Sequence, residues 1–91
     1  MPAVIFTVQL PDGTTKQCYS PSSVVRRYFL TGEEMAATEF LARSQAALGA
    51  ASERVRARFG FSCSASSAQL AQIEQWVSTV PSHSMVRILS I

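Results

Sequence analysis

An alternating apolar stretch near the N-terminus constrains the fold more than any other feature of the sequence. Residues 3–10, AVIFTVQL, place Val, Phe, Val and Leu at every second position, which gives an extended strand one apolar face. The next residues, Pro11-Asp12-Gly13, are typical of a tight turn, because proline presets φ and glycine accepts a positive φ. Residues 14–19, TTKQCY, follow as a returning strand, so the segment predicts a β-hairpin.

The residues after the hairpin predict a short helix. Ser20 is a good N-cap, Pro21 suits the first helical position, and Gly32 ends the element. Four apolar residues share one side of this helix: Val24, Val25, Tyr28 and Phe29. Arg26 and Arg27 point largely away from that side.

A long helix follows and runs to Phe59, before the natural stop at Gly60. Residues 33–37 are ambiguous, and two starts stay open for the helix: a capping box from Thr31 to Glu34, or an N-cap at Thr38. An apolar stripe recurs at spacings of three and four: Leu41, Ser44, Leu48, Ala51 and Val55.

Residues 65–80, ASSAQLAQIEQWVSTV, predict a third helix, which Ser62 or Ser64 caps and Pro81 ends. Its expected buried stripe comprises Leu70, Ile73, Val77 and Val80, with Trp76 beside it. Its expected wetter side comprises Gln69, Gln72 and Gln75. Residues 85–91, MVRILSI, predict a C-terminal strand.

These elements predict one α+β domain over residues 1–91 with the order ββαααβ. A hairpin alone is marginally stable in water, so the last strand must join it. We expect a three-stranded sheet with the first strand in the centre and helices covering one face. If the last strand runs parallel to the first, the crossover is right-handed and the arrangement resembles a β-grasp fold, a similarity of architecture that implies no function.

Composition narrows the class of function. Hydrophobic residues make up 47% of the chain and charged residues 15%, so the whole chain is expected to fold, and its weakly charged surface suggests a partner, such as a second copy in a homodimer. A net charge of +2 is mild for a nucleic-acid binder. The apolar runs are too short to span a membrane, and the N-terminus lacks the basic region of a signal peptide. We therefore expect a cytoplasmic protein that binds neither nucleic acid nor membrane.

The stretch ASERVRARFGFSCS, residues 51–64, holds the densest group of chemically distinctive side chains. Arg54 and Arg58 are four residues apart and share a helix face. Arginines also suit the negative end of the helix dipole, so a solvated helix end explains them without any partner. If the short helix lies alongside, its arginines join them, and the group could face an acidic partner or a phosphate. The candidate partner-binding residues are Arg26, Arg27, Arg54, Arg56 and Arg58.

No complete catalytic or metal-binding set is present. Cys18 and Cys63 lack the CxxC spacing, and with no export signal they are expected to be reduced thiols at the ends of elements. A zinc site needs about four ligands, and His83 adds only one more candidate. We therefore predict no metal, cofactor or catalytic residue. One alternative stays open, because Cys63 precedes a predicted helix N-terminus, which can lower a thiol pKa.

Three stretches taken together, PDGTTKQCYSPSSVV, FLARSQAAL and ASERVRARFGFSCSASSAQL, resemble a family of small bacterial nitrogen-starvation response proteins. The resemblance implies a gene neighbourhood with a nitrilase, a radical SAM protein, a flavin-dependent oxidoreductase and an acetyltransferase. It implies no defined activity, so no catalytic residue is carried over. Both cysteines fall inside the matching motifs, and the resemblance thus favours a shared thiol locus, of structural or chemical role: Cys18, Tyr19 and Cys63.

Two functional hypotheses follow. The first is a non-catalytic accessory or adaptor protein of a bacterial nitrogen-starvation pathway, which binds a partner enzyme through its arginine-bearing helix faces. The second is a small-molecule binder or minor enzyme that uses a cysteine together with Arg54 or Arg58.

Overall fold

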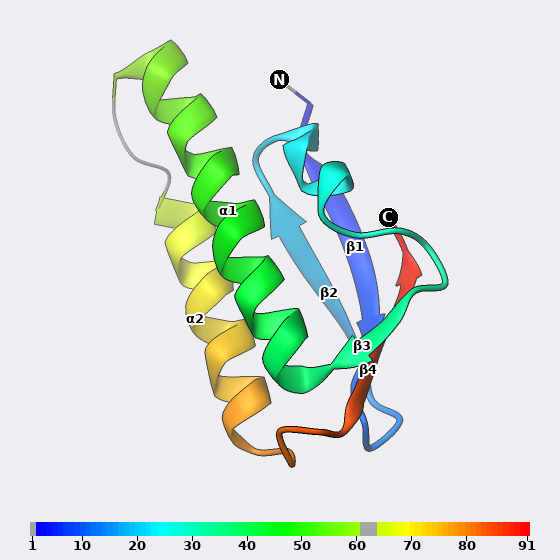
Figure 1. Ribbon diagram of the computed structural model, residues 1–91. Coiled ribbons are helices and arrows are strands. Elements are labelled where there is room, and N and C mark those ends of the chain that lie inside the picture. Colours follow the sequence, from blue (N-terminus) through cyan, green and yellow to red (C-terminus); the bar gives the residue numbers. More distant parts are fainter. Residues whose placement is uncertain (1, 61–63) are drawn as a thin grey trace.

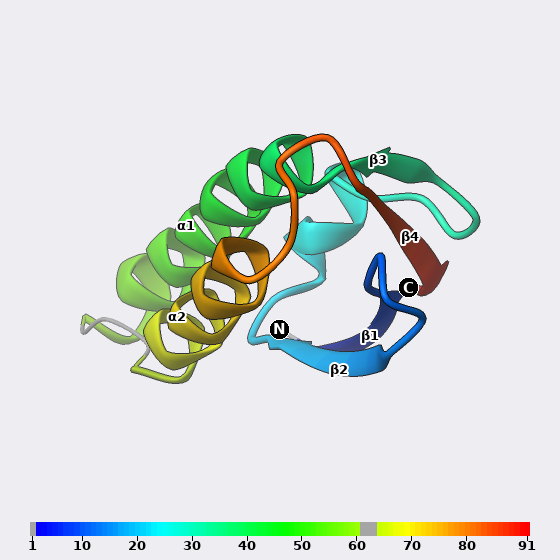
Figure 2. The same cartoon turned by 90° about the horizontal axis from the view of Figure 1, so that it is seen from below.

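The computed structural model describes residues 2–60 and 64–91 as one sheet packed against one layer of helices (Figure 1). The elements in chain order are β1 (Val4–Gln9), β2 (Thr15–Ser20), the 3-10 helix η1 (Ser23–Arg27), β3 (Glu34–Ala36), α1 (Ala37–Phe59), α2 (Ser64–Ser78) and β4 (Met85–Ser90). The strands have the order β2-β1-β4-β3, and every neighbouring pair is antiparallel. Seen from below, the sheet curves around η1 and the helices, which lie on its concave side (Figure 2).

The predicted hairpin is confirmed. Strands β1 and β2 pair in register from Val4 opposite Ser20 to Gln9 opposite Thr15. The turn closes through the backbone N–H of Leu10, which donates to the carbonyl oxygen of Thr14 at 2.8 Å. Gly13 has a φ of 89°, which explains why glycine stands at this position. The alternating apolar residues of β1 all point into the core, as the period of two requires.

The prediction of three helices and a three-stranded sheet is wrong. Within the described residues, the fold has two α-helices and a four-stranded antiparallel sheet, because the ambiguous residues before α1 form the edge strand β3. Met35 lies opposite Val86 in this pairing and is buried. Three residues are too few for a period of two to stand out in the sequence. Both proposed starts of the long helix are also wrong, because its N-cap is Ala36, which has no capping side chain.

The predicted short helix is a single 3-10 segment of five residues. Its N-cap is Ser22, whose hydroxyl accepts from the N–H of Val24 at 3.3 Å, and the predicted cap Ser20 belongs to β2. Ser20 is instead a buried bridge, since its hydroxyl donates to the carbonyl oxygen of Ser22 at 2.7 Å. Side chain to backbone bonds of the two serines thus shift the start of the helix from the predicted cap at Ser20 to Ser22.

The last strand joins the sheet, but not in the parallel sense of a β-grasp fold. β4 pairs antiparallel with β1 on one side and with β3 on the other, so β1 lies between β2 and β4 as expected. The long α1 and the shorter α2 form a helical hairpin, and the turn after α2 brings the chain back along β1 in the opposite direction (Figure 1). No helix within the described ranges is long and apolar enough to cross a membrane.

Three aromatic rings join the layers of the core. The ring of Phe6 on β1 lies 5.8 Å from that of Phe29, and Phe29 lies 5.7 Å from Phe40 on α1. All three side chains are almost completely buried. Offset or tilted rings at this separation attract one another beyond their burial of apolar surface. This chain of contacts fixes the segment after η1 between the sheet and α1.

Gln69 was expected on the wet side of its helix, and the structure corrects this. Its side chain is 7% exposed, and its Oε1 accepts from the backbone N–H of Tyr19 at 3.0 Å. Tyr19 belongs to the edge strand β2, so α2 supplies the partner that a fifth strand would otherwise provide. Periodicity alone could not identify this contact, because it depends on how α2 lies against β2.

We predict that Gln69→Ala lowers the free energy of unfolding by about 1–2 kcal/mol, because the N–H of Tyr19 loses its acceptor in a partly buried place. The measurement is urea unfolding, together with faster amide exchange at Tyr19. The matched control is Gln72→Ala, at an exposed position of the same helix, which should change little. Equal effects of both substitutions would contradict the role assigned to Gln69.

Candidate functional site: the basic end of helix α1

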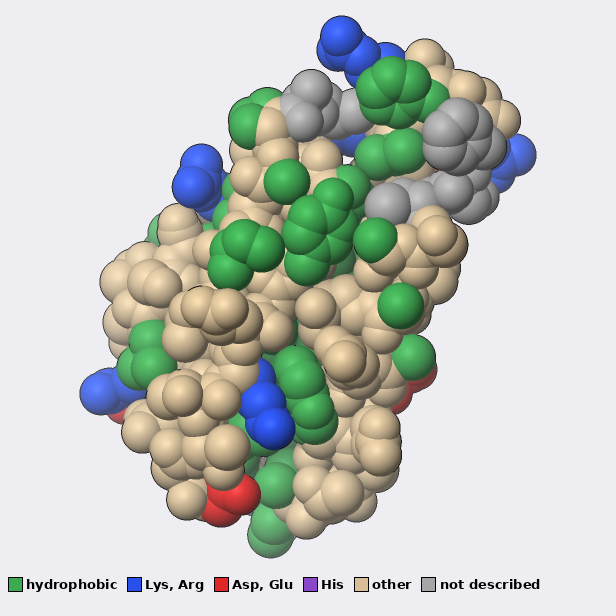
Figure 3. Space-filling view, turned by 180° about the vertical axis from the view of Figure 1, so that it is seen from behind, with side chains coloured by type: hydrophobic (Ala, Val, Ile, Leu, Met, Phe, Trp, Pro, Cys, Tyr) green, Lys and Arg blue, Asp and Glu red, His purple; other side chains and the backbone are tan. Residues whose placement is uncertain are grey.

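The C-terminal end of α1 projects past the sheet as a basic arm (Figure 1). Residues 53–60 are exposed apart from Val55, which is partly buried. Arginines 54, 56 and 58 oppose a single glutamate in this segment, and the resulting surplus of two positive charges equals the net charge of the whole chain. Figure 3 shows basic side chains projecting around this upper end of the molecule. We call the segment 53–60 the basic arm.

The guanidinium groups of the basic arm are only loosely held. Arg56 reaches Glu53 at 3.6 Å, and both side chains are largely exposed. Arg58 lies over the ring of Phe59, 5.8 Å from its centroid. Arg54 has no ion pair within the part of the chain that the structure describes. Exposed pairs of this kind contribute little to stability, so a partner could displace them at small cost.

The short η1 packs beside α1, which was the condition set for a combined arginine surface. Arg43 of α1 donates to the carbonyl oxygen of Tyr28, just after η1, at 3.3 Å. Arg54 follows Arg43 by eleven residues, about three helical turns, and so projects from the same side of α1. Arg26, however, donates from Nε to the carbonyl oxygen of Ile91 at 3.3 Å, while Arg27 is exposed. Arg26 is therefore engaged at the end of β4. The compact part of the candidate partner-binding group is the set of three arginines near the end of α1, which we call the α1 trio: Arg54, Arg56 and Arg58.

An ion-pair network that the sequence did not reveal holds the loop after η1 in place. Arg43 contacts Glu33 at 2.7 Å and Glu39 at 3.0 Å. Glu33 also accepts from the N–H of Leu30 at 3.2 Å. The hydrogen bond from the Arg43 guanidinium holds the pKa of the Glu33 carboxyl below its usual value, and the pKa of Arg43 is raised in return. Only the spacing of Glu39 and Arg43, four residues apart, could have been found in advance.

The structure places the residues of the proposed thiol locus in different surroundings. Cys18 is 1% exposed, and desolvation raises the pKa of its thiol to about 12. Tyr19, the next residue of β2, is partly exposed and projects to the opposite face of the sheet. Cys63 lies outside the described residues, so the shared locus stays a prediction. A buried, protonated thiol such as Cys18 is a poor nucleophile.

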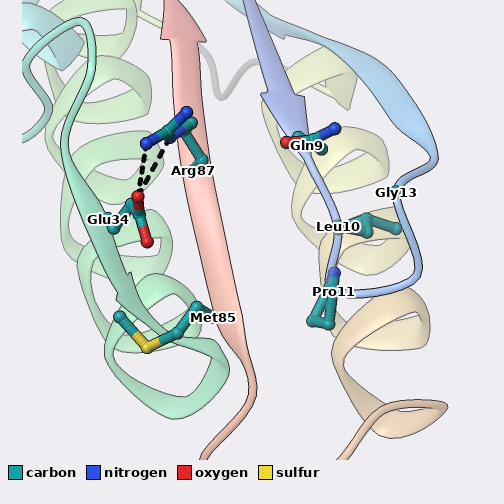
Figure 4. A pocket seen from close by; sticks show the side chains of 7 residues that line it. All are labelled: Gln9, Leu10, Pro11, Gly13, Glu34, Met85 and Arg87. Atoms are coloured by element: carbon teal, nitrogen blue, oxygen red, sulfur yellow. Dashed lines mark hydrogen bonds and ion pairs between the residues drawn. The ribbon is translucent and has the colours of Figure 1, made fainter.

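A shallow hollow of about 400 Å³ lies at one end of the open sheet face (Figure 4). Gln9 is the last β1 residue paired with β4, and continuing that register would bring Pro11, which has no N–H to donate, opposite Met85. The strands diverge there and leave the hollow. On its wall, Nε of Arg87 donates to Glu34 at 3.1 Å, which neutralises the guanidinium. This hollow therefore offers no free charge to a ligand.

Metal binding has no support in the described ranges, where no group of three or more His, Cys, Asp or Glu residues lies close enough to hold an ion. His83 is exposed in the turn between α2 and β4. Among the described residues, the arginines of the basic arm are exposed charged groups that solvent or a ligand can reach.

We expect Arg43→Ala to lose stability in a pH-dependent way. The pKa of Glu33 is lowered from its ordinary value of 4.5 in the folded state, so its contribution to stability is full above that ordinary value and is lost as the pH falls through the folded pKa. The difference in unfolding free energy between the variant and the wild type should thus be larger at pH 7 than at pH 3. Urea unfolding at both pH values checks this, with Arg27→Ala as the control; a difference independent of pH would contradict it.

We predict that Cys18 resists alkylation while the protein is folded. A thiol pKa of about 12 lowers the thiolate fraction at pH 8 on the order of a thousandfold relative to an ordinary cysteine. The measurement is iodoacetamide labelling of a Cys63→Ser variant, in which Cys18 is the remaining thiol, with and without urea. Labelling at the unfolded rate without urea would contradict the burial of this thiol.

Comparison with known proteins assigns the chain to a family. The model of the family described as nitrogen starvation-induced protein NitG matches residues 5–91. No curated protein and no solved structure matches the chain. The match covers every helix and strand but the first residue of β1. The chain therefore belongs to the NitG family of nitrogen starvation-induced proteins.

Proposed function

We propose that this protein is a non-catalytic accessory protein of the nitrogen-starvation response, which docks through its basic arm on an acidic surface of a partner protein. The observation that carries the proposal is the position of the charge. The positive surplus of the chain is concentrated in residues 53–60, at the end of a helix that extends beyond its own core. A protruding and loosely paired group of guanidiniums is suited to reach into another surface.

The composition of the basic arm favours a protein partner. Arginine forms planar, two-pronged hydrogen bonds with carboxylates, so the trio suits a cluster of Asp or Glu side chains. Phe59 adds an apolar contact, because its side chain is 56% exposed next to Arg58. Arginine and aromatic side chains are the types most enriched among the residues that dominate binding energy in interfaces. Charge also steers such encounters and sets their dependence on salt.

The alternative of a cysteine–arginine enzyme receives less support where it uses Cys18, and Cys63 lies outside the described residues. Cys18 is buried under the sheet and protonated, whereas Arg54 and Arg58 project into solvent. Acid–base or nucleophilic chemistry needs groups within hydrogen-bond reach of one another. Self-association remains a second way to use the basic arm, with the acidic residues of another copy as its target.

The test is a photo-crosslinking amino acid at Ala57, an exposed position between Arg56 and Arg58. In nitrogen-starved cells we expect one dominant adduct, which is lost when Arg54 and Arg58 are both changed to Glu. The matched control places the crosslinker at Gln72, on the exposed side of α2. The first partners to examine are the enzymes that the resemblance places in the same gene neighbourhood, and the adduct of this chain with itself would identify a homodimer.

Two results would refute the docking proposal. One is the absence of any adduct specific to Ala57, and the other is an adduct that survives the double charge reversal unchanged. Because Arg54 and Arg58 are exposed and unpaired with acids among the described residues, the reversal should leave the thermal unfolding midpoint within a few degrees of the wild type.

A further inference from the structure

The outer face of the sheet has no layer of helices over it. Within the described ranges, η1, α1 and α2 all lie on the concave side, so the convex side carries the outward-pointing side chains of the strands (Figure 2). Alternate residues of a strand point to opposite faces, and the odd-numbered residues of β1 and β2 therefore point outward. The solvated face of an antiparallel sheet usually carries polar side chains.

The outer face departs from that pattern because apolar side chains gather on it. Ile5 is 57% exposed, Met85 48% and Leu89 37%, and these are three of the five large hydrophobic side chains that are exposed in the described part of the chain. Ile5 lies opposite Tyr19 of β2, which is partly exposed. Seen from behind, hydrophobic side chains are grouped over the middle of the molecule (Figure 3). Burying this group against a partner would remove apolar surface from water, which is favourable.

The charges on the outer face cancel. Arg87 of β4 lies opposite Glu34 of β3, and its Nε donates to the Glu34 carboxylate at 3.1 Å. Lys16 is an even-numbered residue of β2, and its ammonium group lies over Trp76 of α2, 5.6 Å from the ring centroid. The outward residues of β1 and β2 are uncharged: Ile5, Thr7, Gln9, Thr15, Gln17 and Tyr19. Covering this face therefore leaves no unpaired charge buried, which is the change that costs most in an interface.

The polar groups of the outer face favour a second copy of this chain as its occupant. Thr7, Gln17 and Tyr19 each carry a side chain that both donates and accepts hydrogen bonds. In a two-fold symmetric contact the same patch meets itself, so its groups must be able to satisfy one another, and these can. A strongly charged partner finds no complementary charge on this face, because the positive surplus of the chain is in the basic arm.

The size of the outer face limits the stability of such a dimer. Strands lie about 4.8 Å apart and rise about 3.4 Å per residue, so four strands of at most six residues cover a flat area of roughly 400 Å². Standard interfaces bury about 800 Å² on each partner. The convex curvature confines the contact further, to the middle of the face (Figure 2). These dimensions are those of a weak and reversible dimer.

We propose that the outer sheet face forms the contact of a weak homodimer, in which two sheets pack face to face about a two-fold axis. Ile5, Tyr19 and Leu89 form the apolar centre of the contact, and Thr7 and Gln17 hydrogen-bond across it. The axis runs across the strands, so the two basic arms lie at opposite ends of the dimer, where they repel each other least. This contact is separate from the basic arm and does not depend on the docking proposed for it.

The test is sedimentation velocity of the purified chain, combined with NMR spectra recorded on dilution. We expect a monomer–dimer equilibrium with a dissociation constant on the order of 100 µM, so the concentration runs from about 10 µM to about 1 mM. Backbone amide shifts on dilution should be confined to β1, β2 and β4. Salt should change the equilibrium little, because the contact has no net charge. Dilution shifts confined to the basic arm would show a different self-association and would overturn the proposal.

Matched variants locate the contact. Ile5→Lys places like charges on both copies at the centre of the interface and should weaken dimerisation at least about tenfold. Leu89→Lys is a second variant on the same face, and the melting temperature shows whether each variant folds. The control is Leu30→Lys, because this side chain is 68% exposed but lies outside the strands, and it should leave the dimer unchanged.

Three results would overturn the proposal. They are a chain that stays monomeric at about 1 mM, folded Ile5→Lys and Leu89→Lys variants that dimerise like the wild type, and an equal loss of dimer in Leu30→Lys. Changing both Arg54 and Arg58 to Glu should leave the sheet dimer intact, which separates this contact from the basic arm. A monomeric chain would thus leave the docking of the basic arm standing, and failure of the crosslink at Ala57 would leave the sheet dimer standing.

Discussion

The stacking of Phe6, Phe29 and Phe40 is the contact on which the arrangement of the layers depends. Phe29 belongs neither to the sheet nor to α1, yet its ring lies between rings from both. It therefore fixes the chain between η1 and β3, and so fixes the position along the sheet at which α1 starts. Because α1 has 23 residues and the strands have six or fewer, a helix that starts at this end of the sheet must extend past its other end. The basic arm is a geometric result of this mismatch in length.

The charged residues of the fold divide into two groups. Arg43 and Arg87 are matched by glutamates and hold segments of the chain together. The arginines of the basic arm have a single acidic residue near them and contribute little to the stability of the fold. The positive charge of the basic arm thus lies where ion pairing does little to hold the fold together.

Much of the local structure could be predicted from the sequence, and much of the tertiary structure could not. The hairpin was predicted because a period of two and a Pro-Asp-Gly turn specify it within seventeen residues. The end of α1 at Gly60 was predicted for a similar reason, since a glycine with a φ of 81° caps it. β3 was missed because its pairing with β4 joins residues 49 to 53 positions apart, and no local pattern records that. The bond from Gln69 to β2 was missed for the same reason. The arginine trio could be recognised, because its members lie within one helix.

The contact between Gln69 and β2 has a consequence for how copies of this protein behave at high concentration. An uncovered edge strand is a template on which further strands can add, and this leads to aggregates. Here the N–H of Tyr19 is already occupied on one edge, while the other edge, β3, is only three residues long. The Gln69 contact thus blocks one backbone donor of β2, and β3 is too short to pair with a long strand. Within the described residues, the two edges of the sheet therefore differ: α2 contacts the backbone of one, and the other is very short.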